Sequence, residues 1–192
     1  FSTPGSTVAA SCGCYELTQS ANTNEVGTFH QDATIDLSAN FNLKFTVNFG
    51  CDNTGGEGVA FVLQRNPWSV GTGGAGLGYE GISNSLAIEF DTRDNETSGQ
   101  NTLGDVPADH ITIQANGDND HNGANNLLGA TNVFNIINGV ANVEDCLDHT
   151  VEIIWNAGGQ TMDVIVDGGV SSFGGPVAVG DIVTNIFAGN PN

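Results

Sequence analysis

The chain has 192 residues, enough for one domain with a substantial core, and 39% of them are hydrophobic. It carries only 3 Lys and Arg against 22 Asp and Glu, which gives a formal net charge of -19. This balance excludes a basic surface for nucleic acid or for anionic membranes, and it favours cations and neutral partners. No stretch is long and apolar enough for a membrane-spanning helix, so we expect no direct membrane insertion.

The sequence predicts an all-β protein, because it is rich in turn-forming residues, including 27 Gly, and poor in helix-forming runs. Apolar and polar residues alternate along 41–49, which predicts a first strand, and turn residues separate this strand from those that follow. In chain order we expect strands over 41–49, 58–64, 84–91, 110–116, 149–156 and 160–168. The last two strands are joined by Ala-Gly-Gly at 157–159, which indicates a hairpin. Many short strands separated by Gly and Asn turns predict a sandwich or a barrel.

The four cysteines are Cys12, Cys14, Cys51 and Cys146. They form no C-x-x-C pair and have no zinc-finger spacing with histidine. An even number predicts two disulfides in an oxidising compartment, in any of three connectivities. Buried free thiols are the alternative.

The third strand carries two acids side by side on one face. Its apolar residues alternate with Ala87, Glu89 and Asp91, so one face is apolar and the other presents two neighbouring carboxylates. Two such carboxylates repel each other unless something positive lies between them. The next strand begins with His110, and the loop before it contains Asp105.

A metal ion would explain these paired acids. Carboxylate and amide oxygens suit calcium, and an added imidazole suits a transition metal such as manganese. The alternative interpretation is a solvated polar face without a metal.

Five motifs occur in the order GEGVAFVLQ (56–64), GTGGAGLGY (71–79), NSLAIEFDTRDN (84–95), DVPADHITIQ (105–114) and HTVEIIWN with MDVIVDG (149–168). Together they resemble a legume-type (L-type) lectin domain of the bacterial branch that is found in secreted surface proteins. The resemblance runs from about Cys14 to the end of the chain. It implies one domain over 1–192, folded as a concanavalin A-like jelly-roll sandwich of two antiparallel sheets. It also implies a pair of metal ions beneath a shallow sugar site.

The resemblance assigns six residues to a calcium ion and to a neighbouring manganese or other transition-metal ion: Glu89, Asp91, Arg93, Asn95, Asp105 and His110. Asp91 and Asp105 would bridge the two ions, and Arg93 would contribute its backbone carbonyl to calcium. The loop from 96 to 104 is longer than is usual in this family.

The resemblance also implies a carbohydrate site made of Glu57, Gly73, Gly74, Arg93 and Asn95. Two of these residues depart from the family pattern. Glu57 stands where the family usually has an Asp held by a cis peptide, and Arg93 stands where it usually has an aromatic residue. The Arg93 guanidinium is suited to an acidic sugar, or else it neutralises the local acids.

Three other features are best explained by structure and not by function. The segment DNDHNG (118–123) matches the opening of an EF-hand loop, but Gly129 takes the place of the final Glu, so a polar turn is favoured over an extra calcium site. Arg93 replaces the third acid of the E-x-D-x-E pattern of glycoside hydrolases, so we expect no catalytic residues and no enzyme. Trp155 is predicted in the core, and Trp68 lies either at the sugar-site rim or in a packed loop.

The sequence therefore predicts a calcium-dependent carbohydrate-binding adhesion module of a secreted or cell-surface bacterial protein, with glycans or polysaccharide as partners. The alternative is a non-catalytic structural or assembly module that keeps the metal site but not sugar binding. Members of the family continue with one more strand, so we expect that the chain is part of a longer polypeptide, or that another domain or subunit completes the sheet.

Overall fold

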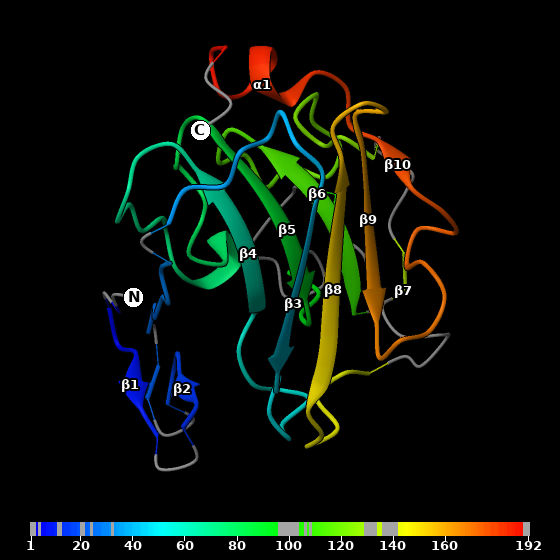
Figure 1. Ribbon diagram of the computed structural model, residues 1–192. Coiled ribbons are helices and arrows are strands. Elements are labelled where there is room, and N and C mark those ends of the chain that lie inside the picture. Colours follow the sequence, from blue (N-terminus) through cyan, green and yellow to red (C-terminus); the bar gives the residue numbers. More distant parts are fainter. Residues whose placement is uncertain are drawn as a thin grey trace.

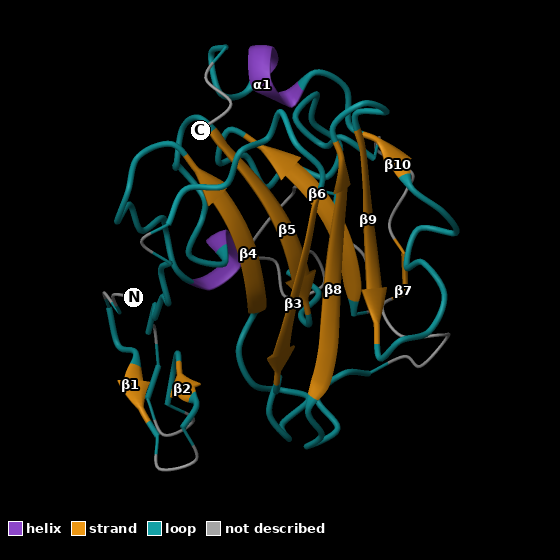
Figure 2. Cartoon of the chain, in the orientation of Figure 1, coloured by secondary structure: helices purple, strands orange, loops and turns teal. Residues whose placement is uncertain are grey.

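The computed structural model of the chain describes residues 3, 5–10, 13–19, 22–23, 25–31, 33–95, 104–105, 107, 109–128, 142–189 and the backbone of 134–135. Its strands are β1 (Val8–Ala9), β2 (Tyr15–Glu16), β3 (Phe41–Val47), β4 (Gly58–Gln64), β5 (Ser85–Asp91), β6 (His110–Ala115), β7 (Phe134–Asn135), β8 (His149–Asn156), β9 (Thr161–Val166) and β10 (Val177–Ala178). The helices of the described residues are the short η1 (Gly74–Gly76) and α1 (Ile182–Asn185), as Figure 2 shows. All six predicted strands are confirmed.

The strands form two four-stranded antiparallel sheets that lie face to face (Figure 1). One sheet has the order β10-β9-β8-β3 and the other has the order β4-β5-β6-β7. The β1-β2 pair forms a separate small ribbon beside the sandwich. The predicted sandwich of two antiparallel sheets is confirmed.

The core fills the space between the two sheets, and it follows from the period-2 alternation of the strands. β5 and β6 contribute Leu86, Ile88, Phe90, Ile111 and Ile113, and β8 and β9 contribute Val151, Ile153, Trp155, Met162 and Val164. Trp155 is only 2% exposed, which confirms its predicted place in the core, and its indole Nε1 donates to the Leu37 carbonyl (2.9 Å). Trp68 is 46% exposed and stacks edge-on against His30.

β5 is buried on both faces, because a loop covers its outer side. Every residue of Ser85–Asp91 is buried. On the outer side, Ala87 packs with Tyr79 and Ile82, which come from the segment between β4 and β5. The acids of this strand therefore lie inside the protein, and the solvated-face interpretation is wrong for Glu89 and Asp91.

A disulfide between Cys51 and Cys146 joins the end of the β3 region to the segment before β8. The Cys146 N–H also donates to the Gly50 carbonyl (2.9 Å). Cys14 is disulfide-bonded as well, so the free-thiol alternative is wrong for these three cysteines. Cys12 lies outside the described residues.

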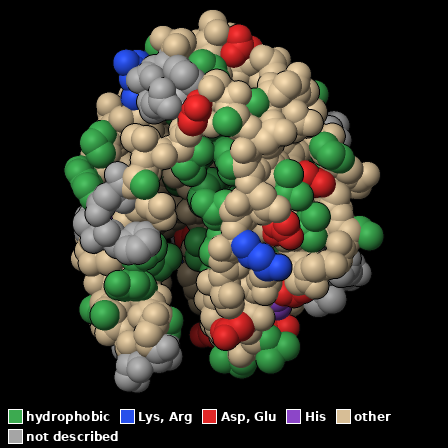
Figure 3. All heavy atoms as spheres, viewed as in Figure 1, with side chains coloured by type: hydrophobic (Ala, Val, Ile, Leu, Met, Phe, Trp, Pro, Cys, Tyr) green, Lys and Arg blue, Asp and Glu red, His purple; other side chains and the backbone are tan. Residues whose placement is uncertain are grey.

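Basic side chains are sparse on the face of the molecule in Figure 3, and acidic side chains are scattered across it. This distribution agrees with the 3 Lys and Arg of the sequence and offers no basic patch on that face. Among the described residues, no helix has the length and apolar character that a membrane crossing requires.

Candidate metal centre and adjoining binding site

β5 and β6 bring the predicted acids and histidine together on the face that points away from the core. The two strands pair antiparallel, with Asp91 opposite His110 and Glu89 opposite Thr112. Ile88 and Phe90 point into the core, so the alternation sends Glu89 and Asp91 to the other side. Glu89 and His110 are 0% and 1% exposed.

Asp105 completes a first group with Asp91 and His110. The three side chains each offer one ligand atom, and these atoms all lie within 4.8 Å of one another. Asp105 Oδ1 lies 3.6 Å from His110 Nε2, and both side chains are almost fully buried. The residues between 96 and 103, where the sequence comparison placed an unusually long loop, lie outside the described residues.

A second group consists of Glu89, His110 and His121, whose ligand atoms also lie within 4.8 Å of one another. His121 Nε2 lies 2.6 Å from Glu89 Oε1 and 3.1 Å from His110 Nε2. Sequence reasoning missed His121. It lies in the DNDHNG segment, which was interpreted as a polar turn, and its position among five Asp, Asn and Gly residues was the one signal in the sequence for a role as a ligand.

The polar-turn interpretation of 118–123 agrees with the backbone of that segment. Asp118 Oδ1 accepts from the Asp120 N–H (3.0 Å), and Asp120 Oδ1 accepts from the Asn122 N–H (2.9 Å). These side-chain turns fold the segment tightly on itself. They leave His121 buried against β5 and β6, at 3% exposure.

Burial, and then the charge of neighbouring acids, strongly raises two pKa values in the cluster. Burial, and next the charge of Asp105, raises the pKa of Asp91 to about 9. Burial, and next the charge of Glu89, raises the pKa of Tyr79, whose hydroxyl donates to Glu89 Oε2 (2.5 Å). Both shifts show that the site is rich in negative charge and screened from water, which is the environment in which a bound cation is most favourable.

The predicted sugar-site side chains lie beside this cluster and are hydrogen-bonded to it. The Asn95 N–H donates to Asp105 Oδ2 (2.8 Å), and its side-chain amide donates to Glu57 Oε2 (2.7 Å). The Arg93 N–H donates to Asp91 Oδ1 (2.8 Å), and its guanidinium lies 3.4 Å from Glu57 Oε1. Arg93 therefore neutralises a local acid, although its side chain remains 38% exposed.

The glycine loop supplies the remaining predicted residues, Gly73 and Gly74. Gly73 precedes the single turn η1, and Gly74 has a φ of 61°, a left-handed conformation that favours glycine. The Asn119 side chain donates to the Ala75 carbonyl (2.8 Å), so the loop that carries His121 is tied to the glycine loop. No cis peptide occurs among the described residues, Glu57 included.

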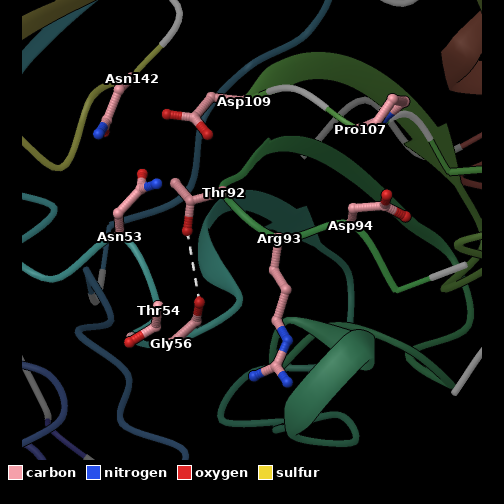
Figure 4. Close-up of a pocket in the computed structure, with 10 residues that line it drawn as sticks. Asn53, Thr54, Gly56, Thr92, Arg93, Asp94, Pro107, Asp109 and Asn142 are labelled. Carbon is pink, nitrogen blue, oxygen red and sulfur yellow. Dashed lines mark hydrogen bonds between the residues drawn. The ribbon is translucent and has the colours of Figure 1, made fainter. Parts of the chain in front are cut away.

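An open polar pocket of about 570 Å³ lies against Arg93 (Figure 4). It is lined by Asn53, Thr54, Gly55, Gly56, Thr92, Arg93, Asp94, Pro107, Asp109 and Asn142. In Figure 4, Thr92 contacts the Gly56 carbonyl, and the Arg93 side chain extends away from Asp109 and Asn142. The pocket thus adjoins the predicted sugar site through Arg93.

An antiparallel jelly-roll sandwich with buried carboxylate and imidazole groups on the outer face of one sheet is a lectin-type fold. The chain belongs to the legume lectin β-barrel domain family, whose family model matches residues 1–192. This membership confirms the resemblance on which the expectations were based. Lectins of this family bind carbohydrates and are not enzymes as a class.

Solved structures of plant lectins share the fold at low sequence identity. Peanut lectin in complex with a 9mer peptide is 21% identical, has a TM-score of 0.58 and is covered over 72% of its length by 92% of this chain. Lectin I from Ulex europaeus in complex with the methyl glycoside of α-L-fucose is 18% identical, has a TM-score of 0.61, and is covered over 78% by 94% of this chain. Basic winged bean lectin with Tn-antigen is 17% identical and has a TM-score of 0.62; the match covers 86% of this chain and 68% of that lectin.

Proposed function

We propose that the chain is a calcium-dependent carbohydrate-binding module without catalytic activity, and that it serves adhesion in a secreted or cell-surface protein. Membership of a lectin family supports this function. So do the solved structures of the same fold that contain a fucose glycoside or Tn-antigen. The disulfide-bonded cysteines support an oxidising compartment outside the cytosol.

The observation that carries the proposal is the hydrogen-bonded connection between the acid cluster and the binding loop. Asn95 joins Asp105 to Glu57 through its backbone and its side chain. Arg93 joins Asp91 to Glu57 in the same way. Because both connections end on acids of the cluster, a cation bound by those acids would also fix the positions of Asn95 and Arg93.

The residues present fit a pair of cations. Asp91, Asp105, Asn95 and the Arg93 carbonyl would hold calcium, since calcium prefers oxygen ligands. Glu89 and His110 would hold a manganese or other transition-metal ion, with Asp91 and Asp105 shared between the two ions. When bound, the cations supply the positive charge that lets the buried carboxylates stay ionised together.

The chain's own residues then position the sugar. Glu57 would accept hydrogen bonds, and the Asn95 amide and the backbone N–H groups of Gly73 and Gly74 would donate them. Glu57 directly precedes β4 and Asn95 follows β5, at the end of the sheet where Gly58 pairs with Asp91. Arg93 is half-exposed beside Glu57 and would tune specificity, because its guanidinium matches an acidic substituent on a sugar.

The first test is a glycan-array screen of the chain in calcium and manganese, repeated in chelator. The proposal expects hits that disappear in chelator and that are lost in Asn95→Ala. Asn42→Ala is the matched control, since Asn42 lies in β3 of the opposite sheet and its amide donates to Glu152. Hits that persist in chelator would contradict the calcium dependence.

A structural or assembly module is the second candidate, and one observation favours it. Both carboxylate oxygens of Glu57 are already engaged within the protein, one by Asn95 and one by Arg93. A sugar must compete with these partners for the same acid. An array without hits in either buffer, together with calcium retained in native mass spectrometry, would select this second function.

A further inference from the structure

His121 gives the cluster a second imidazole that the predicted ligand set did not contain. Its Nε2 faces two other potential ligands, Glu89 Oε1 at 2.6 Å and His110 Nε2 at 3.1 Å. A single N–H proton cannot serve both neighbours. Glu89 Oε1 is moreover buried without a hydrogen-bond partner, and its contact with His121 is an ion pair only if the imidazole is protonated.

The spacing of these atoms suits a shared small cation. A zinc-sized ion holds nitrogen and oxygen ligands at about 2.0–2.2 Å, which places neighbouring ligand atoms about 3.3–3.6 Å apart in a tetrahedral site. The two imidazole nitrogens lie 3.1 Å apart, and all three ligand atoms lie within 4.8 Å of one another. All three side chains are buried, with exposures of 0–3%.

We propose that His121 is a metal ligand, and that Glu89, His110 and His121 bind a late first-row transition metal such as Zn²⁺ in preference to Mn²⁺. The proposal rests on the metal cluster of the proposed function and deepens it. Two imidazoles and one carboxylate favour Zn²⁺, Ni²⁺ or Cu²⁺, whereas Mn²⁺ is favoured by oxygen-rich sites and binds more weakly in the divalent series.

The second imidazole also separates the two metal groups. One imidazole nitrogen binds one cation, and His110 Nε2 belongs to both groups. With His110 taken by the group that contains His121, the other group keeps Asp91 and Asp105, which are oxygen ligands only. His121 thereby makes the transition-metal side nitrogen-rich, while Asp91 and Asp105, which the proposed function shares between the two ions, leave the calcium side with oxygen ligands only.

The position of His121 connects this metal site to the glycine loop. His121 lies two residues after Asn119, whose side chain donates to the Ala75 carbonyl (2.8 Å) within η1. A cation on His121 would therefore fix the 118–123 segment, which is hydrogen-bonded to the residue that follows Gly73 and Gly74.

Calorimetric titration of the full chain tests the proposal, after chelator treatment and with Zn²⁺, Mn²⁺ and Ca²⁺ in separate runs. We expect Zn²⁺ to bind at least tenfold more tightly than Mn²⁺. His121→Ala should weaken Zn²⁺ binding at least tenfold and leave Ca²⁺ binding within threefold of the parent. His30→Ala is the matched control, because it removes an imidazole that stacks on Trp68 outside the cluster. Equal Zn²⁺ affinity in His121→Ala and the parent would overturn the proposal.

X-ray absorption spectroscopy of the Zn²⁺-loaded parent protein provides a test that needs no variant. We expect scattering from two imidazole ligands, and a single imidazole would overturn the proposal even if His121→Ala failed to fold. A glycan array without hits would contradict the proposed sugar binding but would leave a two-imidazole Zn²⁺ site standing, so the two failures are distinguishable.

Discussion

Removal of the Cys51–Cys146 disulfide, by replacing both cysteines with serine, should destabilise the chain strongly. The bond closes a loop with a sequence separation of 95 residues. The loss of loop-closure entropy in the unfolded chain for such a loop is worth about 4.7 kcal/mol at 25 °C. The bond also lies where the β3 and β8 regions meet, beside the hydrogen bond from Cys146 to the Gly50 carbonyl. For a domain of this size, we expect the melting temperature to fall by about 10–15 °C.

The assay is urea unfolding followed by Trp fluorescence, without reductant, since Trp155 is buried in the core. The parent protein, unfolded in reductant, should approach the midpoint of the double-serine variant, and reductant should change that variant much less. A loss below about 1 kcal/mol would refute the reasoning, because it would mean that the unfolded chain is not constrained by this loop.

Four other changes have defined outcomes. Saturating calcium, at about 100 times its dissociation constant, should raise the unfolding free energy by about 2.7 kcal/mol in thermal melts, and an unchanged melt in chelator would count against the metal site. Glu57→Ala should lower glycan affinity more than about tenfold in titration, because charged hydrogen bonds to Asn95 and Arg93 are lost; unchanged affinity would exclude Glu57 from the site. Trp155→Phe leaves the Leu37 carbonyl without its donor and should cost about 1–3 kcal/mol in urea unfolding, whereas no loss would show that water replaces the indole. Burial lowers the pKa of His149, but its contacts with Asp167 and Asp145 outweigh burial and raise it above 6.5. The contribution of these two contacts to the unfolding free energy is therefore fully present below pH 6.5, and about 1 kcal/mol or less is lost as the pH rises through the raised pKa. His149→Gln should remove this pH dependence of the unfolding free energy.

The strands and half of the cluster were predictable because they depend on local alternation. The period-2 pattern fixes which side of β5 carries Glu89 and Asp91, and a hairpin-like register between β5 and β6 places His110 beside them. Burial of these acids was not predictable, since it depends on the segment around Tyr79 that covers the outer face of the sheet.

The remaining features depend on contacts that no periodicity encodes. His121 belongs to an irregular turn, and nothing in its spacing from the strands shows that it points inward. The sequence allows three disulfide connectivities and does not favour any of them. The Cys51–Cys146 disulfide forms because the pairing of β3 with β8 brings these two cysteines together. The engagement of Glu57 by Arg93 is likewise a property of two loops that the fold brings together.

The arrangement of the two sheets has a consequence for how the chain folds. The proposed site is contained within residues 57–121, where β4, β5 and β6 follow one another and pair in sequence. The opposite sheet pairs β3 with β8, which lie on either side of that entire stretch. Local pairings form faster than distant ones. The segment that carries the acids and histidines thus closes through shorter loops than the β3–β8 pairing does, so its strand pairs are expected to form first.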